Sequence, residues 1–228
     1  MPRKTKKAKP HIYVFCEGES EQAYTDFLKE HFEDVAVIKK PKSTGLFEFA
    51  KQKFNNDATY KSNAEITDEI WFFYDVEKKD IGKVEARQKI INELRRLRKK
   101  PNIRVRLLMT TACIEYWLML HYKCFAPSIE TEAEKDKMLR SVVAKESTYE
   151  KGDRSSTAKI AKRYKTANKN AKIVLRNLLP DGLPSLDDTD ERNVWLSESS
   201  KTFSTVFEAV EYLDSLQDKQ IANESENE

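Results

Sequence analysis

Three carboxylates stand where two strongly apolar runs end, a placement typical of divalent-metal chemistry. The run 11–16 ends at Glu17, and the run 69–74 ends at Asp75 and Glu77, with one residue between them. Mg²⁺ prefers hard oxygen ligands and keeps several waters. Glu17, Asp75 and Glu77 together would hold such an ion, and phosphate oxygens would complete its shell. These spacings predict a metal site that handles phosphate esters.

A structural role for each acid is the competing interpretation. A carboxylate after a strand often caps the next helix or stabilises its first turn through the helix dipole. Taken alone, either acidic strand end favours that role. Taken together, after two nearly continuous apolar strands, the two ends favour the metal site.

The residues around these acids predict alternating strands and helices from residue 11 to about residue 122. β-rich apolar runs predict strands at 11–16, 35–38, 69–74 and 103–109. Apolar residues at helical spacing predict helices near 23–32, 44–56, 84–97 and 114–122. This alternation predicts an α/β fold with a mostly parallel sheet flanked by helices. Ligands of such sheets bind outside the carboxyl ends of the strands, where the acids lie.

The chain is expected to divide into four parts. These are a flexible basic arm at 1–10, an α/β core at 11–124, a helical insertion with a C-terminal helical part packing on the core at 125–216, and an acidic tail at 217–228. Within the third part, the patterns predict a polar irregular stretch, one long helix, a loop and a closing helix, at 125–152, 153–179, 180–190 and 202–216.

Composition limits the classes of protein further. Hydrophobic residues make up 39% of the chain, enough for a core, and no apolar run is long enough for a membrane helix or a signal-peptide core. The three cysteines form an odd set in apolar or helical contexts, which indicates reduced thiols and a cytoplasmic protein. The net charge is only +3, so any attraction to a polyanion must come from local patches.

One such patch is expected at 151–176, where nine basic residues face a single acid. One-sign faces attract phosphates and release counterions, and the residues expected to contact nucleic acid are Lys159, Lys162, Arg163, Lys165 and Lys169. A solvated outer face is the alternative, and it is the favoured interpretation for the second basic run at 87–100. No aromatic platform or recognition-helix pattern supports base-specific readout.

Other catalytic signatures are absent from the sequence. It contains no phosphate-binding G-x-x-x-x-G-K-[ST] loop and no G-x-G-x-x-G turn, which argues against nucleoside triphosphatases and dinucleotide enzymes. It also lacks the zinc-protease H-E-x-x-H motif and the G-x-S-x-G nucleophile elbow.

Three stretches resemble the RloB-like family, a Toprim-related prokaryotic family found among phage-defence and restriction-associated genes. They are VFCEGESE, FFYDVE and TACIEYWLMLHY, at 14–21, 72–77 and 111–122. The first two also look like the Toprim arrangement of topoisomerases, primases and OLD-type nucleases. The third is the most specific, because it matches a family pattern with a Glu, a Trp and a His on one helix. The resemblance covers roughly residues 11–216.

The resemblance implies a Toprim-like fold and an endonuclease dependent on Mg²⁺ or Mn²⁺. Such an enzyme would cleave DNA or RNA, tRNA included, in anti-phage defence, with an ATPase or another defence protein as a partner. Glu17 matches the Toprim glutamate, a general acid/base or metal ligand, and Asp75 and Glu77 match the two metal-binding acids. Glu77 departs from the usual Asp, which places a second metal position in question.

Two alternatives to a nuclease remain. A non-catalytic Toprim-like module would bind nucleic acid or a partner within a defence complex and use its acids only structurally. A type I topoisomerase is disfavoured, because the chain is too short for the additional domains and the tyrosine nucleophile of that reaction.

Three further residues are candidates near the site. Glu115 opens the helix after the fourth strand, where it is either a further catalytic or metal-binding acid or a favourable first-turn charge. His121 lies six positions later and therefore on a different helix face. It is interpreted mainly as a core histidine and otherwise as an additional site residue. Glu21, in the first acidic segment, is the third candidate.

Overall fold

Four parallel strands form the centre of the structure, a computed structural model that describes residues 8–225. The strands are β1 (His11–Cys16), β2 (Val37–Lys39), β3 (Thr67–Val76) and β4 (Arg104–Thr111). They lie in the order β2-β1-β3-β4, and every neighbouring pair is parallel. The expected α/β class is confirmed, and the architecture is consistent with a Toprim-like fold. Most of the basic arm expected at 1–10 lies outside the described residues.

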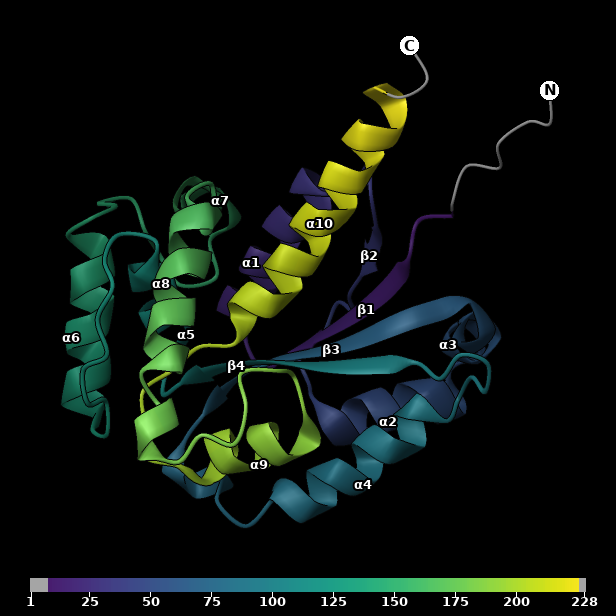
Figure 1. The fold of residues 1–228 in the computed structure, drawn as a ribbon, viewed down its shortest axis with the longest axis horizontal. Helices are drawn as coiled ribbons and strands as arrows, with labels where there is room; N and C mark the ends of the chain where they lie inside the picture. Colours follow the sequence, from purple (N-terminus) through teal and green to yellow (C-terminus); the bar gives the residue numbers. More distant parts are fainter. Residues whose placement is uncertain (1–7, 226–228) are drawn as a thin grey trace.

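Helices cover both faces of this sheet (Figure 1). In the described chain they are α1 (Glu19–His31), α2 (Phe47–Asn56), α3 (Ala58–Asn63), α4 (Val84–Arg95), α5 (Ile114–Leu120), α6 (Glu132–Val143), α7 (Arg154–Ala161), α8 (Tyr164–Arg176), α9 (Asp190–Glu198) and α10 (Val206–Ser225). Helices α2 and α4 lie below the sheet in Figure 1, and α1 and α10 lie above it. Helices α5 and α6 lie at the left, beyond the end where the strands finish.

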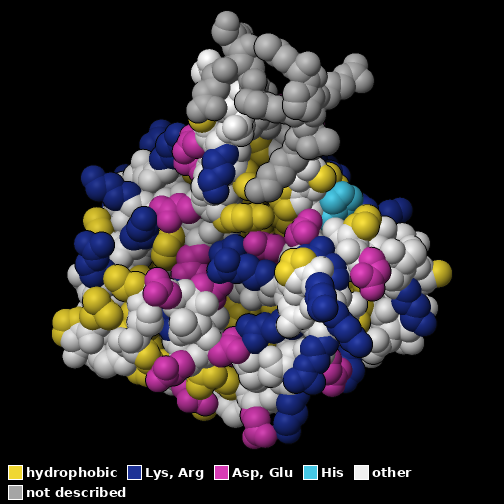
Figure 2. Space-filling view, turned by 45° about the vertical axis from the view of Figure 1, so that its right-hand side comes forward, with side chains coloured by type: hydrophobic (Ala, Val, Ile, Leu, Met, Phe, Trp, Pro, Cys, Tyr) yellow, Lys and Arg dark blue, Asp and Glu magenta, His cyan; other side chains and the backbone are white. Residues whose placement is uncertain are grey.

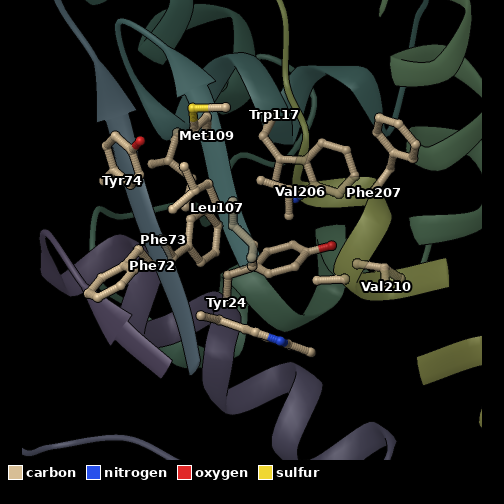
Figure 3. Packing of buried hydrophobic residues seen from close by; sticks show 14 of the residues in the cluster. Tyr24, Phe72, Phe73, Tyr74, Leu107, Met109, Trp117, Val206, Phe207 and Val210 are labelled. Carbon is tan, nitrogen blue, oxygen red and sulfur yellow. The ribbon is translucent and has the colours of Figure 1, made fainter. Parts of the chain in front are cut away.

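Aromatic residues of β3 join the two helical layers to the sheet. Phe72 and Phe73 alternate in direction, as neighbouring strand residues do, and both are fully buried. Phe47 of α2 stacks on Phe72 with ring centroids 4.2 Å apart, and Tyr24 of α1 meets Phe73 edge-on at 6.0 Å. Figure 3 shows this packing continuing to Trp117 of α5. Burial of each such side chain contributes roughly 1.5–3 kcal/mol to the free energy of folding. This packing holds the carboxyl ends of the strands in place.

A short C-terminal segment covers the edge of β4. The Thr205 amide donates to the carbonyl of Met109 at 2.8 Å, and the Thr111 amide donates to the carbonyl of Phe203 at 3.0 Å. These bonds satisfy backbone groups that an open edge strand would leave unpaired. They also fix the start of α10 against the sheet.

Two expectations for the C-terminal half are wrong. The helix expected over 153–179 is two helices, because the chain bends at Arg163 (φ −92°, ψ 19°) so that α7 packs on α1 while α8 packs on α5 and α10. Helix α10 continues to Ser225 into the expected acidic tail, where Gln, Lys and Ala favour helix. The expected helical insertion after residue 125 contains α6, which begins at the capping residue Thr131. The loop expected at 180–190 is followed by α9, which begins at the capping residue Thr189 and which no sequence pattern predicted.

Within residues 8–225, no helix is both long enough and apolar enough to cross a lipid bilayer. Cys16, Cys113 and Cys124 are all free thiols, as expected from their number and context.

Candidate functional site

The adjacency of β1 and β3 brings Glu17 and Asp75 together. Cys16 is level with Phe73 in the sheet, and the Glu17 amide continues the ladder by donating to the carbonyl of Phe73 at 3.0 Å. The Asp75 amide then donates to Glu17 Oε2 at 3.0 Å. Residues 58 positions apart in the chain are therefore in direct contact at the carboxyl ends of two strands.

Glu21 is folded back toward the same point by Gly18, the residue that precedes α1. Glu21 Oε2 accepts the Gly18 amide at 2.9 Å and thereby caps the helix. A Cβ atom at Gly18 would lie only 2.9 Å from Glu21 Oε2, so a larger residue there would displace this carboxylate from its present position. The Glu21 side chain is 4% exposed. One buried carboxylate thus has a structural hydrogen bond and also faces the acids of β1 and β3.

Glu115 enters from the neighbouring strand, β4. The chain passes from β4 into α5 through Ala112, whose φ of 64° lies in the left-handed region that alanine rarely adopts. Its amide donates to the carbonyl of Val76 at 2.9 Å, which holds this turn against β3. Glu115 follows in the first turn of α5 and is 1% exposed. A strained residue of this kind persists only where tertiary contacts hold it, and such residues cluster at functional sites.

A loop before α7 packs against Glu115 and the start of α1. The Tyr149 hydroxyl donates to Glu115 Oε1 at 3.2 Å, and Lys151 Nζ lies 3.4 Å from the same oxygen. The Gly152 amide donates to Ser20 Oγ at 3.1 Å, which ties the loop to the start of α1. Lys151 is 59% exposed, so its ammonium group faces both the acids and solvent.

The carboxyl groups perturb one another electrostatically. Desolvation, and then the charges of Glu21, Glu17, Glu115 and Glu77, raise the pKa of Asp75 well above its ordinary value. Desolvation also raises the pKa of Glu21 to about 7, with Glu17 and Glu115 adding to the effect. Desolvation likewise raises the pKa of Glu17, although the Asp75 amide opposes the change. Four acids from three chain segments therefore form one cluster.

The charges of these carboxylates are not fully compensated by the protein. Asp75 Oδ1 is buried and has no hydrogen-bond partner, an arrangement that is costly for a polar oxygen. A divalent ion would supply the missing partner and offset the repulsion between carboxylates. The residues fit such an ion in type and charge. They do not form a completed cage, because among residues 8–225 no three carboxylate, imidazole or thiolate groups are arranged as metal ligands.

Glu77 is the predicted ligand that the structure directs elsewhere. Its Oε1 contacts Lys135 of α6 and its Oε2 contacts Lys79. Desolvation alone would raise the pKa of Glu77, but the hydrogen bonds from Lys135 and Lys79 lower it below its usual value. Glu77 thus lies at the expected strand end with its charge already neutralised.

The pattern of strand, acids and helix corresponds to a known family. The family model described as RloB-like protein matches residues 12–213, nearly the whole chain. This chain belongs to the RloB-like protein family. A search of curated proteins finds no matching relative.

In this RloB-like protein, His121 lies in the core and away from the acids. It is 1% exposed, with Nε2 3.2 Å from the Tyr24 hydroxyl and Nδ1 3.0 Å from the carbonyl of Trp117. Burial lowers its pKa to about 4. The core interpretation therefore accounts for His121, and its proposed role as an additional site residue has no support from the geometry.

The basic stretch of the RloB-like chain is less uniform in space than in sequence. Lys165 lies 4.0 Å from Asp214 and Lys172 lies 3.0 Å from Glu211, because α10 packs beside α8. Lys159 is paired with Glu146 at 3.8 Å, while Lys162, Arg163 and Lys169 are exposed. On the face seen in Figure 2, basic and acidic side chains likewise lie next to one another. The expected one-sign face is therefore partly neutralised, and nucleic-acid contact there stays a prediction.

Sequence reasoning missed four residues of this RloB-like site as site residues. Tyr149 and Lys151 lie in a stretch interpreted as irregular insertion and basic run, and Lys79 and Lys135 follow no motif. Their importance comes from what they touch: Glu115 for the first two and Glu77 for the other two. The sequence gives only a weak signal for such residues. Tyr149, Lys151 and Lys135 are each 34 or more positions away from the glutamate that they contact.

Proposed function

We propose that this RloB-like protein is a divalent-metal-dependent endonuclease that cleaves phosphodiester bonds of DNA or RNA. The observation that carries the proposal is the buried, unpartnered Asp75 Oδ1 within a cluster of mutually repelling carboxylates at the strand ends. Stability alone does not favour such a cluster, and perturbed acids of this kind are concentrated at functional sites. A role in anti-phage defence, with a partner such as an ATPase, rests on the family resemblance.

The residues have distinct roles in this proposal. Glu17 and Asp75 would hold Mg²⁺ or Mn²⁺, with Glu77 joining them once it leaves its lysines. Such an ion polarises the phosphodiester and lowers the pKa of its bound water. Glu115 and Tyr149 orient Lys151, whose ammonium group would offset the charge of an approaching phosphate. Glu17 is also placed to accept or donate a proton.

The test compares Asp75→Asn with the wild-type protein and with Asp34→Asn, a matched change at an exposed surface acid. Each protein is incubated with Mg²⁺ or Mn²⁺ and a mixture of single- and double-stranded DNA and RNA. Thermal unfolding with and without metal is measured in parallel. We expect Asp75→Asn to abolish cleavage and to lose the stabilisation by metal, while Asp34→Asn retains both. A folded Asp75→Asn protein that cleaves like wild type would refute the site.

The binding module remains a second candidate, because Glu77 is held by lysines and the described residues contain no completed ligand set. It predicts salt-sensitive binding of nucleic acid with no metal-dependent product. The same incubations distinguish the two candidates.

A further inference from the structure

A cavity of about 400 Å³ lies directly beside the acidic cluster. Its wall runs from Val76 and Glu77 at the end of β3 to Ala112, the residue that leads into Glu115. The opposite wall is formed by the start of α6 and by the segment that follows α9. Volumes of this order are typical of sites for small ligands and accommodate roughly one nucleotide. Of the residues that line it, only Glu77 has a role in the site proposed above.

The lining of the cavity combines apolar residues with three lysines and three glutamates, namely Lys78, Lys79, Lys135, Glu77, Glu130 and Glu132. Val76 and Ile129 are each 6% exposed and form buried apolar surface, while Ile81 is 56% exposed at the rim. Lys79 and Lys135 converge on the single carboxylate of Glu77, two residues after Asp75 in the chain, whereas Lys78 pairs with Glu130 at 2.6 Å. A nucleotide has the same two-part chemistry, with a base and sugar that pack on apolar surface and a phosphate that binds ammonium groups.

Lys79 and Lys135 share one carboxylate, that of Glu77. One carboxylate neutralises one charge, yet Glu77 contacts both ammonium groups, one on each oxygen. Lys135 is also 2.9 Å from Glu132, an acid that is 87% exposed and so interacts weakly through solvent. Glu77 is thus the main charge that a phosphate would have to replace. Glu77 is also an acid that the resemblance assigns to the metal. A single movement of its side chain would therefore free the two lysines for a phosphate and bring the carboxylate to the metal.

We propose that this cavity, the Lys79–Lys135 groove, binds one nucleotide of a single-stranded substrate next to the scissile phosphate. Lys79 and Lys135 bind its phosphate, and Glu77 occupies their ammonium groups until substrate or metal displaces it. The identification of the occupant as substrate rests on the proposed nuclease function. Binding itself does not, because it depends on the lysines and not on cleavage.

The test removes the competing carboxylate without changing its shape. Glu77→Gln should free both lysines, whereas Glu93→Gln removes an equal charge at an ion pair far from the groove, that of Lys51 on α2. Fluorescein-labelled short single-stranded oligonucleotides, one of RNA and one of DNA, are titrated in EDTA and followed by fluorescence anisotropy. EDTA keeps metal and cleavage out of the measurement.

We expect Glu77→Gln to bind at least one of the two probes about tenfold more tightly than wild type, corresponding to ~1.4 kcal/mol. Glu93→Gln should bind as wild type does. Adding Lys135→Ala to Glu77→Gln should remove the gain. An unchanged affinity in Glu77→Gln, an equal gain in Glu93→Gln, or a gain that persists without Lys135 would each overturn the proposal. Should Glu77→Gln fail to fold, Lys135→Ala alone decides, because it must weaken binding more than Lys51→Ala does.

The outcome is independent of the nuclease test. A tenfold gain in EDTA together with no cleavage by the wild-type protein would keep the groove and remove the nuclease. Cleavage that depends on Asp75, together with no effect of Glu77→Gln in EDTA, would keep the nuclease and remove the groove.

Discussion

Glu21→Gln should stabilise the metal-free protein, and the gain should depend on pH. Glu21 is buried among like charges, which raise its pKa from 4.5 to about 7 together with desolvation. The native state therefore holds a proton on Glu21 across a range of pH in which the unfolded chain has released it. The contribution of protonated Glu21 to the free energy of unfolding is fully present below pH 4.5 and is lost as pH rises through 7.

The magnitude follows from the two pKa values. Each pKa unit corresponds to 1.36 kcal/mol, so an ionised Glu21 costs the native state about 3 kcal/mol above pH 8. Glutamine retains an oxygen that accepts the Gly18 amide, and it carries no charge. For a chain of this length, a gain of that size raises the melting temperature by about 6–12 °C.

The assay is urea unfolding, followed by circular dichroism from pH 4.5 to pH 8.5 in EDTA. Glu48→Gln, at an exposed position of α2, is the matched control. The free-energy difference between Glu21→Gln and wild type should be near zero at the acid end and grow with pH. Mg²⁺ should reduce that difference, because a bound cation offsets the repulsion in the wild-type protein. A difference that is constant across the pH range would refute the reasoning.

Two further predictions concern the core. His121 is buried and its pKa is lowered from 6.5 to about 4, so its protonation opposes folding. As pH falls from 7 to 4, wild type should lose about 3 kcal/mol of stability relative to His121→Gln in urea unfolding, a trend opposite in sign to that of Glu21. Glu69 accepts three hydrogen bonds from Arg106 at 3.1–3.2 Å, and Glu69→Ala should cost about 3–5 kcal/mol in thermal unfolding because it leaves a buried guanidinium with only Asp188, 4.0 Å away, as a charged partner. A loss below ~1 kcal/mol in that variant would show that Arg106 finds water or another partner.

The strands and most of the core helices follow from local sequence. The apolar runs within β1 and β3 are nearly continuous, which is what strands covered on both faces require, and β4 contains the shorter run Leu107–Met109. The predicted helices after Glu17, Asp75 and Glu115 are present because their apolar residues repeat at helical spacing. Helix α9 was missed, since its buried positions include Arg192 and Asn193, which carry no hydrophobic pattern.

The sequence by itself determined that acids stand at two strand ends and in the first turn of the helix after a third strand, because each acid is close in the chain to its strand. Only the tertiary structure decided which acids face one another. The order β2-β1-β3-β4 places Glu17 against Asp75, and the turn at Ala112 places Glu115 beside them. Lys151 and Lys135 reach the acids from a loop and from α6, over 36 and 58 positions of the chain, and no local pattern encodes such contacts. Local periodicity specifies elements, whereas the electrostatic environment of each carboxylate depends on charges that only folding brings near.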